Sequence, residues 1–257
     1  MRSKKILFYI ALFTLCLTFI KVEAQGYKIK TIVIDAGHGG IKPGASGKYS
    51  LEKNVSLKVA LKLGELLQQE LPGVKIIQTR KNDVDVDWYR RAEIANDAKA
   101  DLFISIHCNS MPKGNNYTKG TETFVGAYRR INEMDAGLRE NEEFIKDKNY
   151  KEKDEGPVGP EEQIMLALYK SLYRSKSLAL AKLIQKNYTE VNKRVNRGVK
   201  EQGLLVLQRT AMPSILTEIG FISTPSEEDY INSPEGQEEI ITAITNAVKQ
   251  YKKYIEN

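Results

Sequence analysis

The chain contains only two histidines, and each directly follows an expected strand. His38 lies in IDAGHGG and His107 lies in ISIHCNS. Imidazole is the commonest metal ligand among protein side chains, although most histidines bind no metal. Because both histidines stand at the ends of expected strands, we interpret them as two ligands of one metal site.

A catalytic zinc site requires a third protein ligand and an open position for water. Cys108 is one candidate, but successive residues of a strand point to opposite faces, so His107 and Cys108 should not reach one ion. We therefore expect Cys108 to be a small buried residue. Glu52 is the better candidate, because it stands in the first turn of an expected helix just after the glycine-rich loop. Taken alone, Glu52 is explained at least as well as a carboxylate stabilised by the helix dipole.

Glu218 is an acidic residue inside an otherwise apolar run, PSILTEIGF. An unpaired buried charge costs several kcal/mol or takes up a proton, so its presence needs an explanation. One explanation is a buried salt bridge. The other is a general base whose raised pKa suits it to accept a proton from water.

Several other catalytic patterns are excluded by the sequence. The loop AGHGGIKPGASGKYS contains Gly47-Lys48 followed by Tyr49, without the glycine five residues earlier that a phosphate-binding loop requires. Neither HExxH nor GxSxG occurs in the chain. The chain therefore has neither the helix motif of a common metalloprotease nor the nucleophile turn of an α/β-hydrolase.

The elements that must position these residues alternate between strand and helix patterns. Apolar runs predict strands at KIKTIVIDAG, VKIIQT and DLFISIH. Helical spacing of apolar residues predicts helices between them, over residues 52–70 and 87–98. This βαβαβ order predicts a parallel sheet with helices on both faces, in which functional residues gather at the carboxyl ends of the strands.

A charged segment interrupts this alternation after a fourth expected strand near residues 120–125. In residues 129–155, 16 of 27 positions are charged. We interpret the region at about 127–160 as a charged helical insertion or lid outside the core. A solvated surface insertion explains the same composition, because charged runs are usually solvated.

The C-terminal part returns to patterns typical of a folded core. A long helix is expected from about Glu161 to Tyr188, and a last helix over residues 235–254. GLLVLQ and PSILTEIGF are two further strand candidates. The expected fold is a single three-layer α/β domain with a mostly parallel sheet of about six strands flanked by helices.

The first 24 residues have the pattern of a secretory signal peptide. MRSKK is followed by the apolar run Ile6–Ile20 and by Val22-x-Ala24, so we expect cleavage after Ala24. The run is shorter than the ~20 residues needed to cross a bilayer, so no stable membrane span is expected after cleavage. Export would carry the chain through the inner membrane into the periplasm or cell envelope.

Charge and cysteine content exclude two further classes. The full chain has a net charge of +6, and removal of residues 1–24 takes away four basic residues and one acidic residue, leaving 35 and 32. A net charge of +3 without a basic cluster does not favour nucleic acid as a partner. Cys108 would be the only cysteine left, which excludes an intramolecular disulfide framework.

Four motifs, in this order within residues 28–254, are shared with a known family: IVIDAGHGG, the triplet Glu52-Lys53-Asn54, ADLFISIHCNS and PSILTEIGFIS. The chain resembles the zinc-dependent N-acetylmuramoyl-L-alanine amidases used in cell separation. Further positions that look like those of the family are Arg80, Arg91-x-x-x-Ala95-Asn96 and Arg197-Gly198-Val199-Lys200.

The resemblance implies one Zn²⁺ per chain, with His38, Glu52 and His107 as its ligands and Glu218 as the catalytic residue. It also implies hydrolysis of the amide bond between N-acetylmuramic acid and the L-alanine of the stem peptide in peptidoglycan, during cell-wall remodelling and daughter-cell separation. Two further side chains are predicted to bind substrate or support the site, namely Asn109 and Arg91.

Some family members carry, at the place of the charged insertion, a helix that blocks the zinc until an activator protein displaces it. By this resemblance Glu140 is the first candidate for an autoinhibitory zinc ligand and Glu142 is the second. The partners implied are therefore peptidoglycan and an activator protein.

Two other functions compete with the amidase. One is a zinc peptidase that cuts within stem peptides, and the other is a wall-binding scaffold that has lost catalysis. The second is disfavoured because all four site residues are present, whereas a degenerate member would be expected to lack one.

Overall fold

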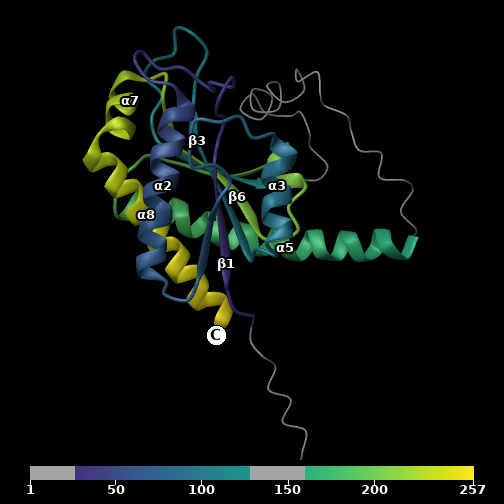
Figure 1. Ribbon diagram of the computed structural model, residues 1–257. Helices are drawn as coiled ribbons and strands as arrows, with labels where there is room; N and C mark the ends of the chain where they lie inside the picture. The colour runs from purple at the N-terminus through teal and green to yellow at the C-terminus, as the bar shows by residue number, and fades with distance from the viewer. Residues whose placement is uncertain (1–26, 128–159) are drawn as a thin grey trace, which may run out of the picture.

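The computed structural model describes residues 27–127 and 160–257 of the chain. The predicted signal peptide and most of the predicted insertion lie outside these residues. The described part forms a sheet with helices on both of its faces (Figure 1). Within it, no helix is both long and apolar enough to cross a membrane.

The sheet has six strands in the order β2-β1-β3-β6-β4-β5. All neighbouring strands are parallel except β4 and β6, which are antiparallel. The prediction of a mostly parallel sheet of about six strands is confirmed. In chain order the strands are β1 (Thr31–Ala36), β2 (Lys75–Gln78), β3 (Leu102–Asn109), β4 (Thr121–Gly126), β5 (Asn196–Gln202) and β6 (Ser214–Phe221).

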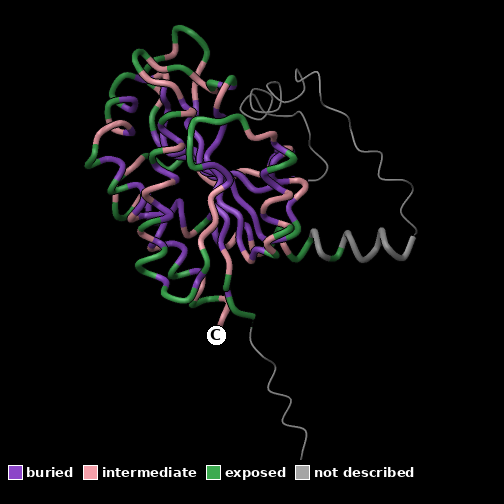
Figure 2. Tube along the Cα trace, in the orientation of Figure 1, coloured by how far each residue is buried: buried purple, intermediate pink, exposed green. Residues whose placement is uncertain are grey.

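Helices form the outer layers, and each layer covers its own hydrophobic cluster. The larger cluster joins one face of the sheet to α2 (Glu52–Glu70), α5 (Pro160–Glu190) and α8 (Pro234–Glu256). The smaller cluster joins the other face to α3 (Trp88–Asp97) and α6 (Leu205–Gln208). Figure 2 shows the buried residues concentrated along the strands between these layers. The predicted three-layer architecture is confirmed.

Alternation along β3 decides which side chains can act together. Ile106 and Cys108 point into the larger cluster, whereas Phe103 packs in the smaller one. His107 therefore leaves the sheet on the face covered by α3. Cys108 is 1% exposed and lies in the core, so the prediction that it is a small buried residue is confirmed.

The predicted helices are all present, and each end lies within two residues of the structure's bounds. The prediction of a strand at GLLVLQ is wrong, because Leu205–Gln208 form the short helix α6. A short apolar run cannot be distinguished from a buried helix by its pattern, and here Val206 and Leu207 pack in the smaller cluster. The strand in this region is instead the polar β5, which lies at the edge of the sheet.

Helix α7 (Pro225–Asn232) was also not predicted from the sequence. It follows β6 and begins with a proline, the residue whose fixed φ suits the first helical turn. Its buried Glu228 accepts hydrogen bonds from the backbone N–H groups of Lys48, Tyr49 and Ser50. Helix α7 thereby holds the loop that runs from His38 to the start of α2.

Candidate metal centre

His38 lies two residues beyond the carboxyl end of β1, in a turn with an unusual backbone. Its φ is 57°, in the left-handed region that side chains other than glycine rarely adopt. Such a conformation persists only where the surrounding structure holds it in place. The polar contacts of the turn show how it is held.

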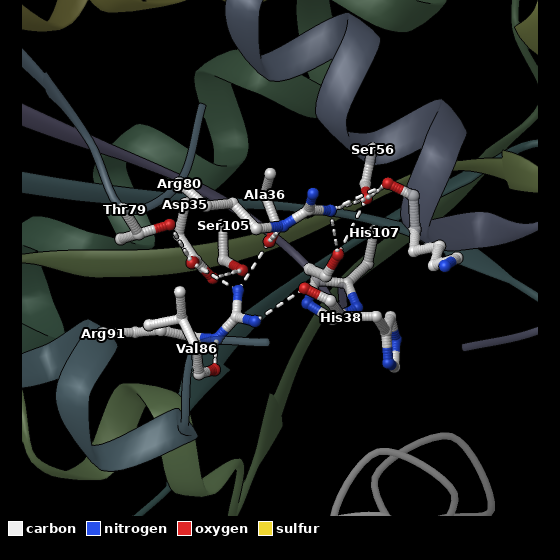
Figure 3. Close-up of polar contacts among 12 residues, drawn as sticks. Asp35, Ala36, His38, Ser56, Thr79, Arg80, Val86, Arg91, Ser105 and His107 are labelled. Carbon is white, nitrogen blue, oxygen red and sulfur yellow. Dashed lines mark hydrogen bonds and ion pairs between the residues drawn. The ribbon is translucent and has the colours of Figure 1, made fainter. Parts of the chain in front are cut away.

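Arg91 is the first of two buried arginines that bind this turn. Its Nη2 donates to the carbonyl of His38 at 2.7 Å, and its Nη1 donates to the carbonyl of Ala36 at 2.5 Å. The residue is 1% exposed. Figure 3 shows the guanidinium group directed at the backbone of the turn. Of the two roles predicted for Arg91, this position favours support of the site over contact with substrate.

Arg80 is the second arginine and follows β2. Its Nη2 donates to the carbonyls of Gly37 and Lys53, both at 2.8 Å, and its Nε donates to Ala36 at 2.9 Å. Burial, with a smaller effect of the neighbouring Arg91, lowers the pKa of Arg80 to about 10. Because Lys53 belongs to the first turn of α2, Arg80 connects the His38 turn to the helix that carries Glu52.

Asp35 supplies the negative charge between these cations. Its carboxylate accepts from Arg91 Nη1 at 2.8 Å, Ser105 Oγ at 2.7 Å and Thr79 Oγ1 at 2.6 Å (Figure 3). Burial acts to raise the pKa of Asp35, but Arg91 and the two hydroxyl groups outweigh it and hold the pKa below its usual value. Asp35 is therefore ionised at neutral pH and binds Arg91 as a buried ion pair.

Glu52 lies between the two histidines. Its Oε2 is 3.2 Å from His38 Nε2, and its Oε1 is 3.0 Å from His107 Nδ1. The exposed fraction is 3% for each histidine and 1% for Glu52. The residues come from three elements, namely the turn after β1, the first turn of α2 and the end of β3. The structure thus brings together the three residues predicted as metal ligands.

Two glycines provide the space for these side chains. A Cβ at Gly44 would lie 2.5 Å from His38 Cδ2 and 2.6 Å from Glu52 Oε2. A Cβ at Gly37 would lie 2.5 Å from the ring of His107. Only glycine at these positions leaves the imidazole and carboxylate groups where they are.

The donor set of this cluster fits a zinc ion. One ligand atom from each of His38, Glu52 and His107 lies within 4.8 Å of the others. Zinc binds imidazole nitrogen and carboxylate oxygen at about 2.0–2.2 Å, and ligands at those distances stand a little over 3 Å apart in a tetrahedron. Two imidazoles and one carboxylate are also a ligand set found in catalytic zinc sites. The cluster therefore has the residue types and the spacing of a three-ligand centre.

Glu218 enters this region from β6. It is 2% exposed, and its Cα is the register partner of His107 across the parallel pair β3 and β6. Register partners extend their side chains from the same face of a sheet, on strands about 4.8 Å apart. The position of Glu218 is therefore one strand away from the metal-ligand cluster, on the same face.

Comparison with known proteins assigns this arrangement to a family. The family model described as N-acetylmuramoyl-L-alanine amidase matches residues 32–250. The chain belongs to this amidase family. The match includes residues of all six strands of the amidase and the four residues just described.

Curated proteins and solved structures agree with this assignment. The amidase is 30% identical over 238 residues to N-acetylmuramoyl-L-alanine amidase AmiA of Escherichia coli (strain K12), across 92% of this chain and 81% of AmiA. A crystal structure of N-acetylmuramoyl-L-alanine amidase from Clostridium difficile 630 matches with a TM-score of 0.65 at 28% identity, across 88% of this chain and 98% of that one. The CwlD amidase from Clostridioides difficile, solved in complex with the GerS lipoprotein, also has a TM-score of 0.65 and 28% identity, across 88% and 99% of the two chains.

Glu122 is a residue of this site that sequence reasoning missed. It is 3% exposed on β4, and its Cα is the register partner of Glu218 on the side away from His107. Asn109 Nδ2 donates to its carboxylate at 3.2 Å. Glu122 stands in the predicted strand TETFV, so the argument applied to Glu218, an acidic residue inside a strand, would have identified it.

The remaining predicted residues fall into two groups. Asn109 is 5% exposed at the end of β3, where its Nδ2 donates to Glu122, the register partner of Glu218. Glu140 and Glu142, the candidates for an autoinhibitory ligand, lie outside the described residues.

Proposed function

We propose that the protein uses one bound Zn²⁺ to hydrolyse the amide bond between N-acetylmuramic acid and the L-alanine of the stem peptide in peptidoglycan. Its ligands would be His38, Glu52 and His107, and Glu218 would transfer the proton. The observation that carries this proposal is the buried cluster of two imidazoles and a carboxylate with a second carboxylate one strand away. Family membership supports the choice of bond.

In the proposed reaction, Glu218 is the side chain that transfers the proton. A bound Zn²⁺ supplies a Lewis acid for the scissile carbonyl and lowers the pKa of water toward ~7. The Glu218 carboxylate accepts a proton from the attacking water, whose oxygen forms a bond to the lactyl carbonyl carbon. When the C–N bond breaks, Glu218 delivers that proton to the leaving nitrogen of L-alanine. The products are a free lactyl carboxylate on the sugar and a stem peptide with a free amino terminus.

The test is metal content together with product identity. The chain purified from residue 25 onward should contain about one zinc per molecule by mass spectrometry. It should also release peptides from purified cell-wall sacculi, and a chelator should abolish this release until zinc is returned. Intact stems beginning with L-alanine are the expected product.

Two results would contradict the proposal in different ways. Peptides cut between residues of the stem would identify a zinc peptidase instead. A folded protein that binds no zinc, and gains no activity when zinc is added, would identify a wall-binding scaffold.

We further propose that the charged insertion inhibits the enzyme at rest, with Glu140 or Glu142 as a fourth zinc ligand. Two observations support this proposal. Residues 129–155 are rich in charged side chains, and they stand at the place in the chain where some members of the family carry a blocking helix. Deletion of residues 129–155 should raise the basal rate of release from sacculi, as should Glu140→Ala. An equal or lower rate in a folded deletion variant would argue against inhibition.

An activator protein is the partner that this inhibition would require. The complex of the CwlD amidase with the GerS lipoprotein shows that a similar amidase binds another protein. Pull-down with the full-length chain and with the chain lacking residues 129–155 tests the partner, because a protein that acts on the insertion should bind only the former.

Export to the cell envelope and a part in daughter-cell separation complete the proposal. Support comes from the N-terminal pattern and from the substrate, which lies outside the inner membrane. Amino-terminal sequencing of the protein from the envelope should begin at Gln25. Deletion of the coding sequence should leave chains of unseparated cells, and normal separation would contradict the cellular role without affecting the chemistry.

A further inference from the structure

Two basic side chains of β5 bind the same buried carboxylate. Arg197 Nε donates to Glu122 Oε1 at 2.7 Å, and Lys200 Nζ is 3.0 Å from the same oxygen. The side chain of Glu122 is 3% exposed, but those of Arg197 and Lys200 are 35% and 28% exposed. The carboxylate is thus buried while both cations reach solvent.

The guanidinium group of Arg197 is held in one orientation and still has donors to offer. Its Cζ lies 5.0 Å from the centre of the Phe221 ring, and its Nε is engaged by Glu122. Among the described residues, neither terminal nitrogen of Arg197 donates a hydrogen bond to a protein group. A guanidinium group fixed through Nε presents its terminal nitrogens as a fork that matches a carboxylate.

The charges of this cluster do not cancel. One buried carboxylate requires one cation, as in the pair formed by Arg194 and Glu227 at 2.6 Å. Glu122 has two cations, so these three residues alone carry one excess positive charge; the next carboxylate along the sheet, Glu218, is 2% exposed and lies on the side of the metal-ligand cluster. An excess charge at a partly exposed position favours an anionic ligand.

The cluster lies in line with the proposed catalytic residues. Across the sheet, β3, β6, β4 and β5 are successive neighbours, and they carry His107, Glu218, Glu122 and Arg197 respectively. Strands are about 4.8 Å apart, so the strand of Arg197 lies about 10 Å from that of Glu218 and about 14 Å from that of His107. This separation corresponds to roughly three or four residues of extended peptide.

We propose that Arg197 and Lys200, positioned by Glu122, form a subsite that binds a carboxylate in the peptide part of the substrate. This inference rests on the proposed amidase function. The lactyl carboxyl group of N-acetylmuramic acid is consumed in the amide bond, and hydroxyl and acetamido groups are uncharged. The anion within reach is therefore a carboxylate of the peptide, a few residues from the bond that is cut.

The test compares two synthetic N-acetylmuramoyl tripeptides that differ only in having free carboxylates or carboxamides. The zinc-loaded wild-type protein should hydrolyse the carboxylate form with a kcat/KM about tenfold higher or more, the scale of one or two charge-assisted hydrogen bonds. Arg197→Met should reduce this preference to near one, because it removes the fork of N–H donors that binds the free carboxylate. Lys200→Met provides a second variant with the same expected direction.

A matched control lies on helix α5 and pairs with the same strand. Arg174 pairs with Glu201 of β5 at 2.5 Å and is 46% exposed, so Arg174→Met removes an equivalent ion pair from an exposed position. This variant should keep the wild-type preference. Circular dichroism and thermal unfolding establish that each variant is folded.

The outcomes separate the subsite from the reaction. Equal hydrolysis of both substrates by the wild-type protein would overturn the subsite and leave the amidase function intact. So would an Arg197→Met variant that loses activity equally on both substrates, since that pattern indicates a purely structural cation. Hydrolysis of neither substrate by a zinc-loaded, folded wild-type protein would overturn the proposed function and the subsite together.

Discussion

His107 on β3 and Glu218 on β6 are Cα partners in adjacent parallel strands, with their side chains on the same face of the sheet. His107 and Glu218 are more than a hundred positions apart in the sequence, and the strand register places them side by side. Glu122 extends the row by one strand, and Glu52 reaches it from the first turn of α2 at 3.0 Å from His107. The predictions below follow from this arrangement and from the contacts that hold it.

Because Glu218 is not one of the three proposed metal ligands, zinc binding and catalysis should be separable by mutation. Glu218→Gln should keep wild-type zinc content and lower release from sacculi by about 10²–10⁴-fold, the usual contribution of a general base. Metal analysis and release assays on one preparation measure both. Glu201→Gln, on the partly exposed part of β5, is the control and should keep full activity. Loss of zinc from Glu218→Gln would show instead that Glu218 shapes the metal site.

Gly44 predicts a steric effect that its backbone alone would not cause. Gly44 and Gly73 have φ values of +66° and +89°, but only at Gly44 would a Cβ meet other atoms, those of His38 and Glu52. Gly44→Ala should therefore displace the ligands and weaken zinc binding by at least tenfold, a loss measurable by competition with a chromogenic chelator. Gly73→Ala bears only the backbone strain of about 1–2 kcal/mol and should bind zinc normally. Equal zinc affinity in both variants would contradict the role of Gly44.

The buried pair of Arg91 and Asp35 predicts strong coupling in stability. Arg91→Met should lower the free energy of unfolding by about 3–5 kcal/mol, because it leaves the Asp35 carboxylate buried without its cation. Adding Asp35→Asn should cost less than the sum of the two single changes, with a coupling of about 1–3 kcal/mol in urea unfolding.

Arg90, the neighbour of Arg91 on α3, forms an ion pair whose coupling energy serves as the reference for this double-mutant cycle. Arg90 and Glu93 are 3.2 Å apart, but their side chains are 52% and 38% exposed. Their coupling should be below about 1 kcal/mol because water screens exposed pairs. A coupling as small for Arg91 and Asp35 would show that the buried ion pair does not hold the turn at His38.

Glu228 predicts a stability that depends on pH. Burial acts to raise its pKa, but the N–H groups of residues 48–50 and the Ser50 hydroxyl outweigh it and hold the pKa below the usual 4.5. A depressed pKa in the folded state gives stability that is present above the unfolded value and is lost as the pH falls through the folded one. Glu228→Gln should thus cost about 1–3 kcal/mol at pH 7 and progressively less below about pH 4.5.

Thermal unfolding of both proteins between pH 7 and pH 3 measures this difference. Glu238→Gln, an exposed position on α8, is the control and should change stability by less than about 0.5 kcal/mol at any pH. A difference between wild type and Glu228→Gln that stays constant down to pH 3 would contradict the proposed contacts of the carboxylate.

Sequence periodicity predicted the parts of the fold in which local pattern and final environment agree. Strand β3 is an apolar run buried on both faces, and helix α2 buries the side that its period of 3.6 indicates, so both elements could be predicted from the sequence. Pattern failed at Leu205–Gln208, where a short apolar run suits either state, and at β5, whose exposed edge position tolerates the polar residues of NRGVKEQ. In both places packing against the rest of the chain decided the structure.

For the site, the sequence by itself determined which residue types stand at the ends of strands and within them. Two histidines after apolar runs and an acidic residue within a strand were sufficient to predict a metal centre and a proton carrier. The tertiary structure alone decided which residues stand together, because strand order, register and the antiparallel direction of β4 depend on contacts between distant segments. Those contacts place Glu52 between His38 and His107, and set Glu122 with its two cations beside Glu218, a relationship that no local spacing in the chain encodes.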